Sequence, residues 1–158
     1  MMKIAIASDH AGFHFKEAIR KKLALEGYQV LDYGTNDETP VGVGPFAQQV
    51  ARAVSLQEAE RGILICGTGG GMSICANRYP GVRAVLCFSE FTALNARKHN
   101  DANILILGAR TIELPQALAL VDIFLGTPFD GGKYAERLQY IEEIEKEVWT
   151  LLQKKFSS

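Results

Sequence analysis

The chain has 158 residues, of which 47% are hydrophobic and 22% are charged, and its formal net charge is −1 at pH 7. This composition is ordinary for a soluble globular protein and excludes the excess of positive charge that binds nucleic acid or anionic membranes. No apolar run approaches the length of a membrane span, and Asp9 interrupts the N-terminal apolar run too early for a signal peptide. We therefore expect one domain, residues 1–158, in the cytoplasm, with neither nucleic acid nor membrane as a partner.

Strand-like and helix-like segments alternate along the chain. Short apolar runs predict strands over residues 3–8, 28–33, 62–66, 82–87 and 103–107. Apolar residues at helical spacing predict helices over residues 13–25, from Pro45 onward, from Met72 onward, and over residues 89–98, 113–125 and 133–155. Such alternation is typical of an α/β protein with a parallel sheet covered by helices on both faces.

The most informative segment is the glycine-rich stretch from residue 62 to 77, GILICGTGGGMSICAN. A short buried strand ends at Cys66, five residues rich in glycine follow, and a helix begins after them. Glycines let a ligand approach the main chain, and a helix start directs free N–H groups into the same space. The sequence thus predicts an anion-binding turn with a thiol at its mouth.

The three cysteines are Cys66, Cys75 and Cys87. Their spacing is not that of a CxxC metal site, and the three histidines are scattered, so we expect neither a metal nor a cofactor. In a reducing compartment all three are free thiols. Cys75 and Cys87 are interpreted as small core residues, whereas Cys66 is followed directly by the glycine turn.

Several polar residues follow strands and should lie at one edge of the sheet. In a parallel sheet, ligands bind beyond the carboxyl ends of the strands. Asp9 and His10 follow the first strand, Cys66 the third and Arg110 the fifth. An Asp after a strand is also a common helix cap, so Asp9 and His10 become informative only beside the thiol and the glycine turn.

A second group of candidates lies elsewhere in the sequence. Lys133 and Arg137 are four residues apart at the start of the last helix, so they share a face that suits an anion, although a solvated basic face is the alternative for Lys133. His99 precedes the fifth strand and should lie at the edge opposite Cys66. His99 either takes part in the active site of a partner subunit or is only a surface histidine at the end of a helix. The long last helix either closes the core or clasps a second subunit.

These segments resemble the ribose-5-phosphate isomerase B family, which also includes galactose-6-phosphate and allose-6-phosphate isomerases. The resemblance covers nearly the whole chain. Its most specific parts are the cysteine–glycine–threonine–glycine segment and the histidine–asparagine–aspartate segment. The matching motifs are SDHAGF (8–13), DYGT (32–35), ICGTGGGMSICAN (65–77), GVRA (81–84), ARKHNDAN (96–103), LGAR (107–110) and FDGGKYAERL (129–138).

The resemblance implies a three-layer Rossmann-like α/β/α sandwich around a five-stranded parallel sheet, assembled as a homodimer or a dimer of dimers with active sites between subunits. It implies metal-independent aldose–ketose isomerisation of a sugar phosphate, ribose 5-phosphate to ribulose 5-phosphate by default, through a cis-enediolate. In this reading the catalytic residues are Cys66 as the base, Thr68 and His99 for ring opening, and Asp9 for the sugar hydroxyls. The implied substrate-binding residues are His10, Gly67, Gly69, Gly70, Gly71, Asn100, Arg110, Lys133 and Arg137.

The sequence departs from the family pattern at three places. Val41-Gly42-Val43-Gly44 replaces the usual Asp-Tyr-Pro segment, whose tyrosine lines the sugar pocket, so another aldose phosphate such as allose 6-phosphate or galactose 6-phosphate is an alternative substrate. Lys133 stands where arginine is common, and Gly70 where a branched apolar residue is usual. A sugar-phosphate-binding module without catalysis is the alternative from another class, and a nucleotide-binding protein is disfavoured because SDHAG is not GxGxxG.

Overall fold

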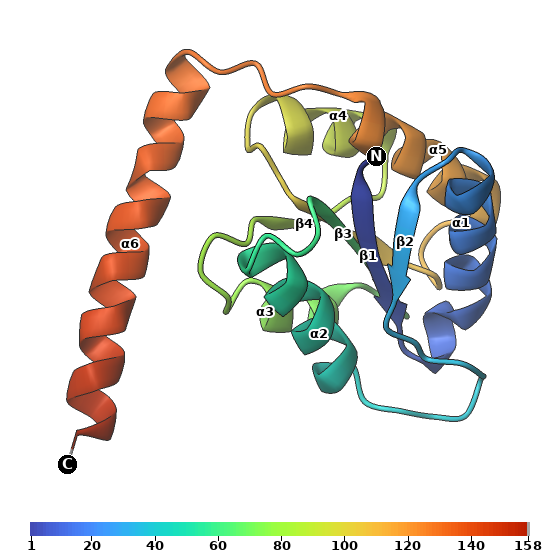
Figure 1. The fold of residues 1–158 in the computed structure, drawn as a ribbon, viewed down its shortest axis with the longest axis horizontal. Helices are drawn as coiled ribbons and strands as arrows, with labels where there is room; N and C mark the ends of the chain where they lie inside the picture. The colour runs from blue at the N-terminus through green and yellow to red at the C-terminus, as the bar shows by residue number, and fades with distance from the viewer. Residues whose placement is uncertain (158) are drawn as a thin grey trace.

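Five parallel strands form one sheet at the centre of the molecule (Figure 1). The computed structural model describes residues 1–157. The strands are β1 (Lys3–Ser8), β2 (Gln29–Asp32), β3 (Arg61–Cys66), β4 (Ala84–Leu86) and β5 (Ile104–Gly108). Their order across the sheet is β2-β1-β3-β5-β4. The chain therefore passes to opposite sides of β1 for β2 and β3, and the gap between the ends of β1 and β3 is a topological switch point, where such sheets bind ligands.

Helices cover both faces of this sheet, as the sequence predicts. The helices are α1 (Phe13–Leu25), α2 (Gly44–Ser55), α3 (Gly70–Ala76), α4 (Glu90–Lys98), α5 (Leu114–Gly126) and α6 (Lys133–Phe156), with a short 3₁₀ turn, η1, at His10–Gly12. One apolar core joins the sheet to α1, α4 and α5, and the other joins it to α2 and α3. Alternate residues of each strand enter the two cores, and Cys66 belongs to the core on the α2 and α3 face. Within the described chain, no helix combines the length and the apolar character needed to cross a membrane.

Two boundaries differ clearly from the sequence-based prediction. The helix after the glycine turn begins at Gly70, because two of the glycines already adopt its first turn. The fourth strand is only Ala84–Leu86 and not residues 82–87, because the Asn77 side chain bonds both the N–H and the carbonyl of Ala84. By contrast, the helix predicted to start at Ser89 has its cap there, where Ser89 and Thr92 form a capping box.

The last helix, α6, stands away from the sheet and its two helical layers (Figure 1). It has no buried residue along its 24 residues, so it does not close the core. One side of α6 nevertheless faces the body of the protein across a groove of about 950 Å³. Glu145 bridges the two by accepting a hydrogen bond from the Gly81 N–H at 2.6 Å.

Candidate active site

Cys66 ends β3 beside the topological switch point. The parallel register pairs Ser8 with Ile65 and Cys66 with Gly108, so β1, β3 and β5 end at one edge of the sheet. The Cys66 side chain is buried. The N–H of Gly69 donates a hydrogen bond to its sulfur at 3.2 Å. This donor interaction stabilises negative charge on the sulfur.

The turn after Cys66 requires glycine at one position in particular. Gly69 has a φ of +84°, and a Cβ there would lie 2.5 Å from Leu86 Cδ1. Both the backbone conformation and the space therefore exclude a side chain. The next residue, Gly70, donates its N–H to Thr68 Oγ1 at 3.3 Å, which orients the threonine within the turn. The turn thus holds a thiol and a hydroxyl close together.

Asp9, His10 and Arg110 lie at the same edge of the sheet as this turn, because they directly follow β1 and β5. Asp9 is buried; its Oδ1 caps η1 by accepting the Gly12 N–H at 3.1 Å, and its own N–H bonds the Ile65 carbonyl at the end of β3. The Arg110 side chain lies over Gly67, whose added Cβ would be 3.4 Å from both Cδ and Nη1 of the arginine. A carboxylate, an imidazole and a guanidinium therefore stand at the edge that carries the thiol.

A second cluster gathers the remaining predicted residues at the junction of α4 and α6. The imidazole ring of His99 stacks on the Tyr134 ring, with centroids 4.1 Å apart and planes 12° from parallel. The cations of Lys133 and Arg137 lie 5.2 and 5.5 Å from the centre of the same ring. Asn100 is exposed and lines the groove beneath α6. Tyr134 was not among the predicted site residues, although its place between Lys133 and Arg137 could have suggested it.

The two clusters lie at opposite ends of the strands, one beyond their carboxyl ends and the other before their amino ends. His99 and Asn100 precede the first residue of β5, whereas Cys66 pairs with Gly108 at its last residue. A strand of this length spans about 13 Å. A single chain therefore keeps its thiol and its histidine–arginine cluster apart.

The segment that departs from the family pattern contacts the first cluster. The N–H of Val41 donates a hydrogen bond to Nδ1 of His10 at 3.1 Å. The side chain of Val43 rests on Gly71, where an added Cβ would be 3.0 Å from Val43 Cγ2. The sequence predicts a loop with two flexible glycines here, and the structure shows that Val41 and Val43 contact His10 and Gly71.

The other two cysteines are separate from this chemistry. Cys87 is buried against the opposite core from Cys66, and burial raises the pKa of its thiol to about 12. Cys75 is half-buried on α3. Among residues 1–157, no three His, Cys, Asp or Glu side chains are grouped so as to hold a metal ion.

Comparison with known proteins agrees with the fold and shows the family. The model of the ribose/galactose isomerase family matches residues 4–141. Ribose-5-phosphate isomerase B of Escherichia coli is 42% identical over 146 residues, which are 92% of this chain and 98% of that protein. The structure of ribose-5-phosphate isomerase B from Clostridium thermocellum has a TM-score of 0.91 and 48% identity, covering 93% of this chain and 99% of the other. The enzyme from Mycoplasma genitalium, solved with bound ribulose 5-phosphate, has a TM-score of 0.89 and 39% identity, covering 92% and 97%.

These relatives and the shared fold make the chain an α/β enzyme of the aldose–ketose isomerase class. Within that class, the chain belongs to the ribose/galactose isomerase family.

Proposed function

We propose that this enzyme interconverts ribose 5-phosphate and ribulose 5-phosphate, with Cys66 as the base. The observation that carries the proposal is the buried Cys66 thiol, which receives the Gly69 N–H at the switch point of the sheet. The names of its relatives support the substrate. The Cys66 side chain can take up and return a proton, and the Gly69 N–H beside it favours the thiolate that acts as the base.

The proposed reaction moves one proton between carbons. The Cys66 thiolate takes the proton from C2 of the open-chain aldose. The electron pair of that C–H bond forms the C1=C2 double bond, and the π pair of the carbonyl moves onto O1 to give a cis-enediolate. The thiol then returns a proton to C1, and a proton passes from O2 to O1, which leaves the ketose. A base of matched strength contributes roughly a hundredfold to ten-thousandfold to such a step.

The turn supplies the groups that stabilise the intermediate in this proposal. The N–H groups of Gly69 and Gly70 already donate to Cys66 and Thr68. The enediolate oxygen would therefore accept hydrogen bonds from the N–H groups of Gly67 and Gly71. One such donor typically stabilises a transition state by about 3 to 4 kcal/mol. Asp9 keeps one carboxylate oxygen for the sugar hydroxyls, because only Oδ1 caps η1.

We further propose that two subunits form each active site. Thr68 and His99 would open the sugar ring, and His10 and Arg110 of one subunit would hold the phosphate together with Lys133, Arg137 and Asn100 of the other. The distance between the two clusters within one chain supports this arrangement, because His99 cannot serve the Cys66 of its own chain across the sheet. Phosphate held between several cations anchors the end of the substrate that does not react and orients C1 and C2.

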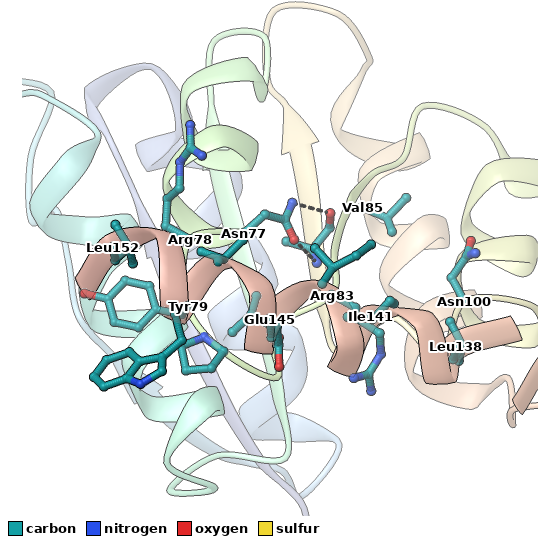
Figure 2. Close-up of a pocket in the computed structure, with 16 residues that line it drawn as sticks. Asn77, Arg78, Tyr79, Arg83, Val85, Asn100, Leu138, Ile141, Glu145 and Leu152 are labelled. Atoms are coloured by element: carbon teal, nitrogen blue, oxygen red, sulfur yellow. Dashed lines mark hydrogen bonds between the residues drawn. The ribbon is translucent and has the colours of Figure 1, made fainter. Parts of the chain in front are cut away.

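The exposed stripe of α6 supports a dimer. Ile144, Val148, Trp149 and Leu152 are between 44% and 64% exposed, although they line the largely apolar groove below α6. Figure 2 shows this groove, with Leu152 labelled at one end of it. A helix with no fully buried residue gains little stability from its own chain. A second chain seated in this groove, with about 800 Å² covered on each partner, would bury these side chains.

The substrate is tested by assaying the purified enzyme on ribose 5-phosphate, allose 6-phosphate and galactose 6-phosphate. We expect turnover of ribose 5-phosphate. Turnover only of a hexose phosphate would mean that the altered loop at Val41–Gly44 accompanies a change of substrate specificity. Binding of all three sugar phosphates without turnover would favour the non-catalytic alternative.

The shared site is tested by mixing two inactive variants, Cys66→Ala and His99→Ala. In a mixed dimer, one of the two sites receives Cys66 from one chain and His99 from the other. Random exchange of subunits therefore restores about a quarter of the wild-type activity if the sites are shared. If each site lies within one chain, the mixture stays inactive.

A further inference from the structure

The Val41–Gly44 segment is fixed to the candidate site at two points. At the first, the backbone N–H of Val41 donates to Nδ1 of His10 at 3.1 Å. At the second, Val43 packs on Gly71, where the distance from an added Cβ to Val43 Cγ2 would be only 3.0 Å. Val43 also occupies the N-cap position of α2, the helix that follows this segment. The segment is therefore a supported wall and not a free loop.

The first contact determines the chemical state of His10. A backbone N–H can only donate, so Nδ1 of His10 must accept and carries no proton. The imidazole is then neutral, and its single proton lies on Nε2. In the described part of the chain, no hydrogen bond involves Nε2 of His10. Its N–H is therefore the donor that the ring can offer to a ligand.

The packing of Val43 on Gly71 keeps the Val41 N–H in place. Gly71 lacks the side chain that would push Val43 outward, and Val43 stands two residues after Val41. Because the valine fits the space above the glycine, the Val41 N–H has a fixed direction toward His10. The position of the His10 ring thus depends on a segment that carries no charged side chain.

We propose that Val41 is a positioning residue whose backbone N–H makes His10 a neutral, oriented hydrogen-bond donor to the phosphate of the substrate. The proposal rests on the proposed function for the identity of the anion. In this proposal Arg110, Lys133 and Arg137 supply the positive charge at the phosphate. His10 contributes only an oriented N–H donor. The segment therefore determines how tightly the phosphate end is held and not the rate of proton transfer at Cys66.

The test removes the Val41 N–H and observes His10 directly. NMR of isotope-labelled protein should show a nitrogen–nitrogen coupling between the Val41 amide and His10 Nδ1, and a proton only on Nε2. Val41→Pro, or the ester analogue of Val41 that replaces only its N–H, should lose this coupling and show some protonation of Nδ1. We expect both variants to bind inorganic phosphate about tenfold more weakly and to raise KM by a similar factor, with kcat little changed. Val41→Ala keeps the N–H and should restore the coupling and the phosphate affinity.

The outcomes separate this inference from the proposed function. A proton on Nδ1 of His10 in the wild type would overturn the inference, as would unchanged phosphate affinity in the folded ester variant. A variant that lost kcat but kept its phosphate affinity would also contradict it. The NMR and phosphate measurements need no turnover, so a wild type inactive on every sugar phosphate would refute the proposed function while the state of His10 was still determined.

Discussion

The N–H of Gly69 points at the sulfur of Cys66 from three residues further along the chain, at 3.2 Å. This contact exists because Gly69 adopts a left-handed conformation in which its amide turns back toward the end of β3. Gly69 therefore allows the turn and also supplies a hydrogen-bond donor to the sulfur, which the proposed mechanism uses.

Gly69→Ala should impair both stability and activity. An alanine in this conformation costs about 1 to 2 kcal/mol from its backbone alone, and its Cβ would collide with Leu86. Gly27→Ala is a matched control, because Gly27 has a φ of +86° but no atom within 4 Å of an added Cβ. We expect urea unfolding to show the backbone cost in both variants, and isomerase assays to show a loss only in Gly69→Ala. Equal activity in the two variants would contradict this role of Gly69.

Gly71→Ala should weaken substrate binding by displacing Val43. The added methyl group would stand 3.0 Å from Val43 Cγ2, although alanine suits a helix better than glycine. The double variant Gly71→Ala with Val43→Ala removes the opposing methyl groups and should recover most of the lost affinity. Steady-state kinetics of the two single variants and the double variant give the coupling between the positions. Additive effects would mean that the packing of Val43 on Gly71 does not support the site.

Glu17→Gln should flatten the dependence of stability on acid pH. Hydrogen bonds from Arg20 and then from the buried Lys16 lower the pKa of Glu17 from 4.5 to about 2. Because the folded-state pKa is depressed, Glu17 stabilises the fold above about pH 4.5, and this contribution is lost as the pH falls toward 2. Solvent screening of this partly exposed group keeps the effect on the order of 1 kcal/mol. Unfolding free energies of variant and wild type that stay parallel from pH 6 to pH 2.5 would contradict the assignment.

Trp149→Glu should weaken the proposed dimer. Trp149 is 64% exposed and lines the groove below α6, so a charge there would be buried against the partner. We expect the dissociation constant of the dimer to rise about a hundredfold, as for a central aromatic contact. Sedimentation at micromolar concentration measures it. Glu143→Lys, on the opposite side of α6, should leave the dimer intact, and equal dissociation by both variants would count against the groove as the interface.

Much of the fold and of the first cluster could be predicted from the sequence, because both follow from local patterns. Apolar runs locate the strands, and the rule for parallel sheets brings Asp9, Cys66 and Arg110 to one edge. Lys16 could not be predicted in the same way. It lies among apolar positions of a helix and reads as a surface residue, yet it is fully buried against Asp32, which is 16 residues away on β2.

The contact between the Val41–Gly44 segment and His10 could not be predicted from the sequence either. Its contact with His10 uses a backbone N–H, and every residue except proline has one, so no residue type marks it. Its two glycines suggest mobility, whereas the packing of Val43 on Gly71 depends on a residue almost 30 positions later. Contacts of this kind appear only when the chain is folded.

The central claim is that Cys66 moves the proton in a sugar-phosphate isomerisation, and the most direct test is the conversion of ribose 5-phosphate in deuterium oxide, followed by NMR. We predict that the wild type forms ribulose 5-phosphate with deuterium at C1, because the Cys66 thiol exchanges with solvent before it returns a proton. Cys66→Ala should lose this conversion by at least about a hundredfold, while Cys75→Ser retains it. Undiminished conversion and labelling by Cys66→Ala would contradict the account.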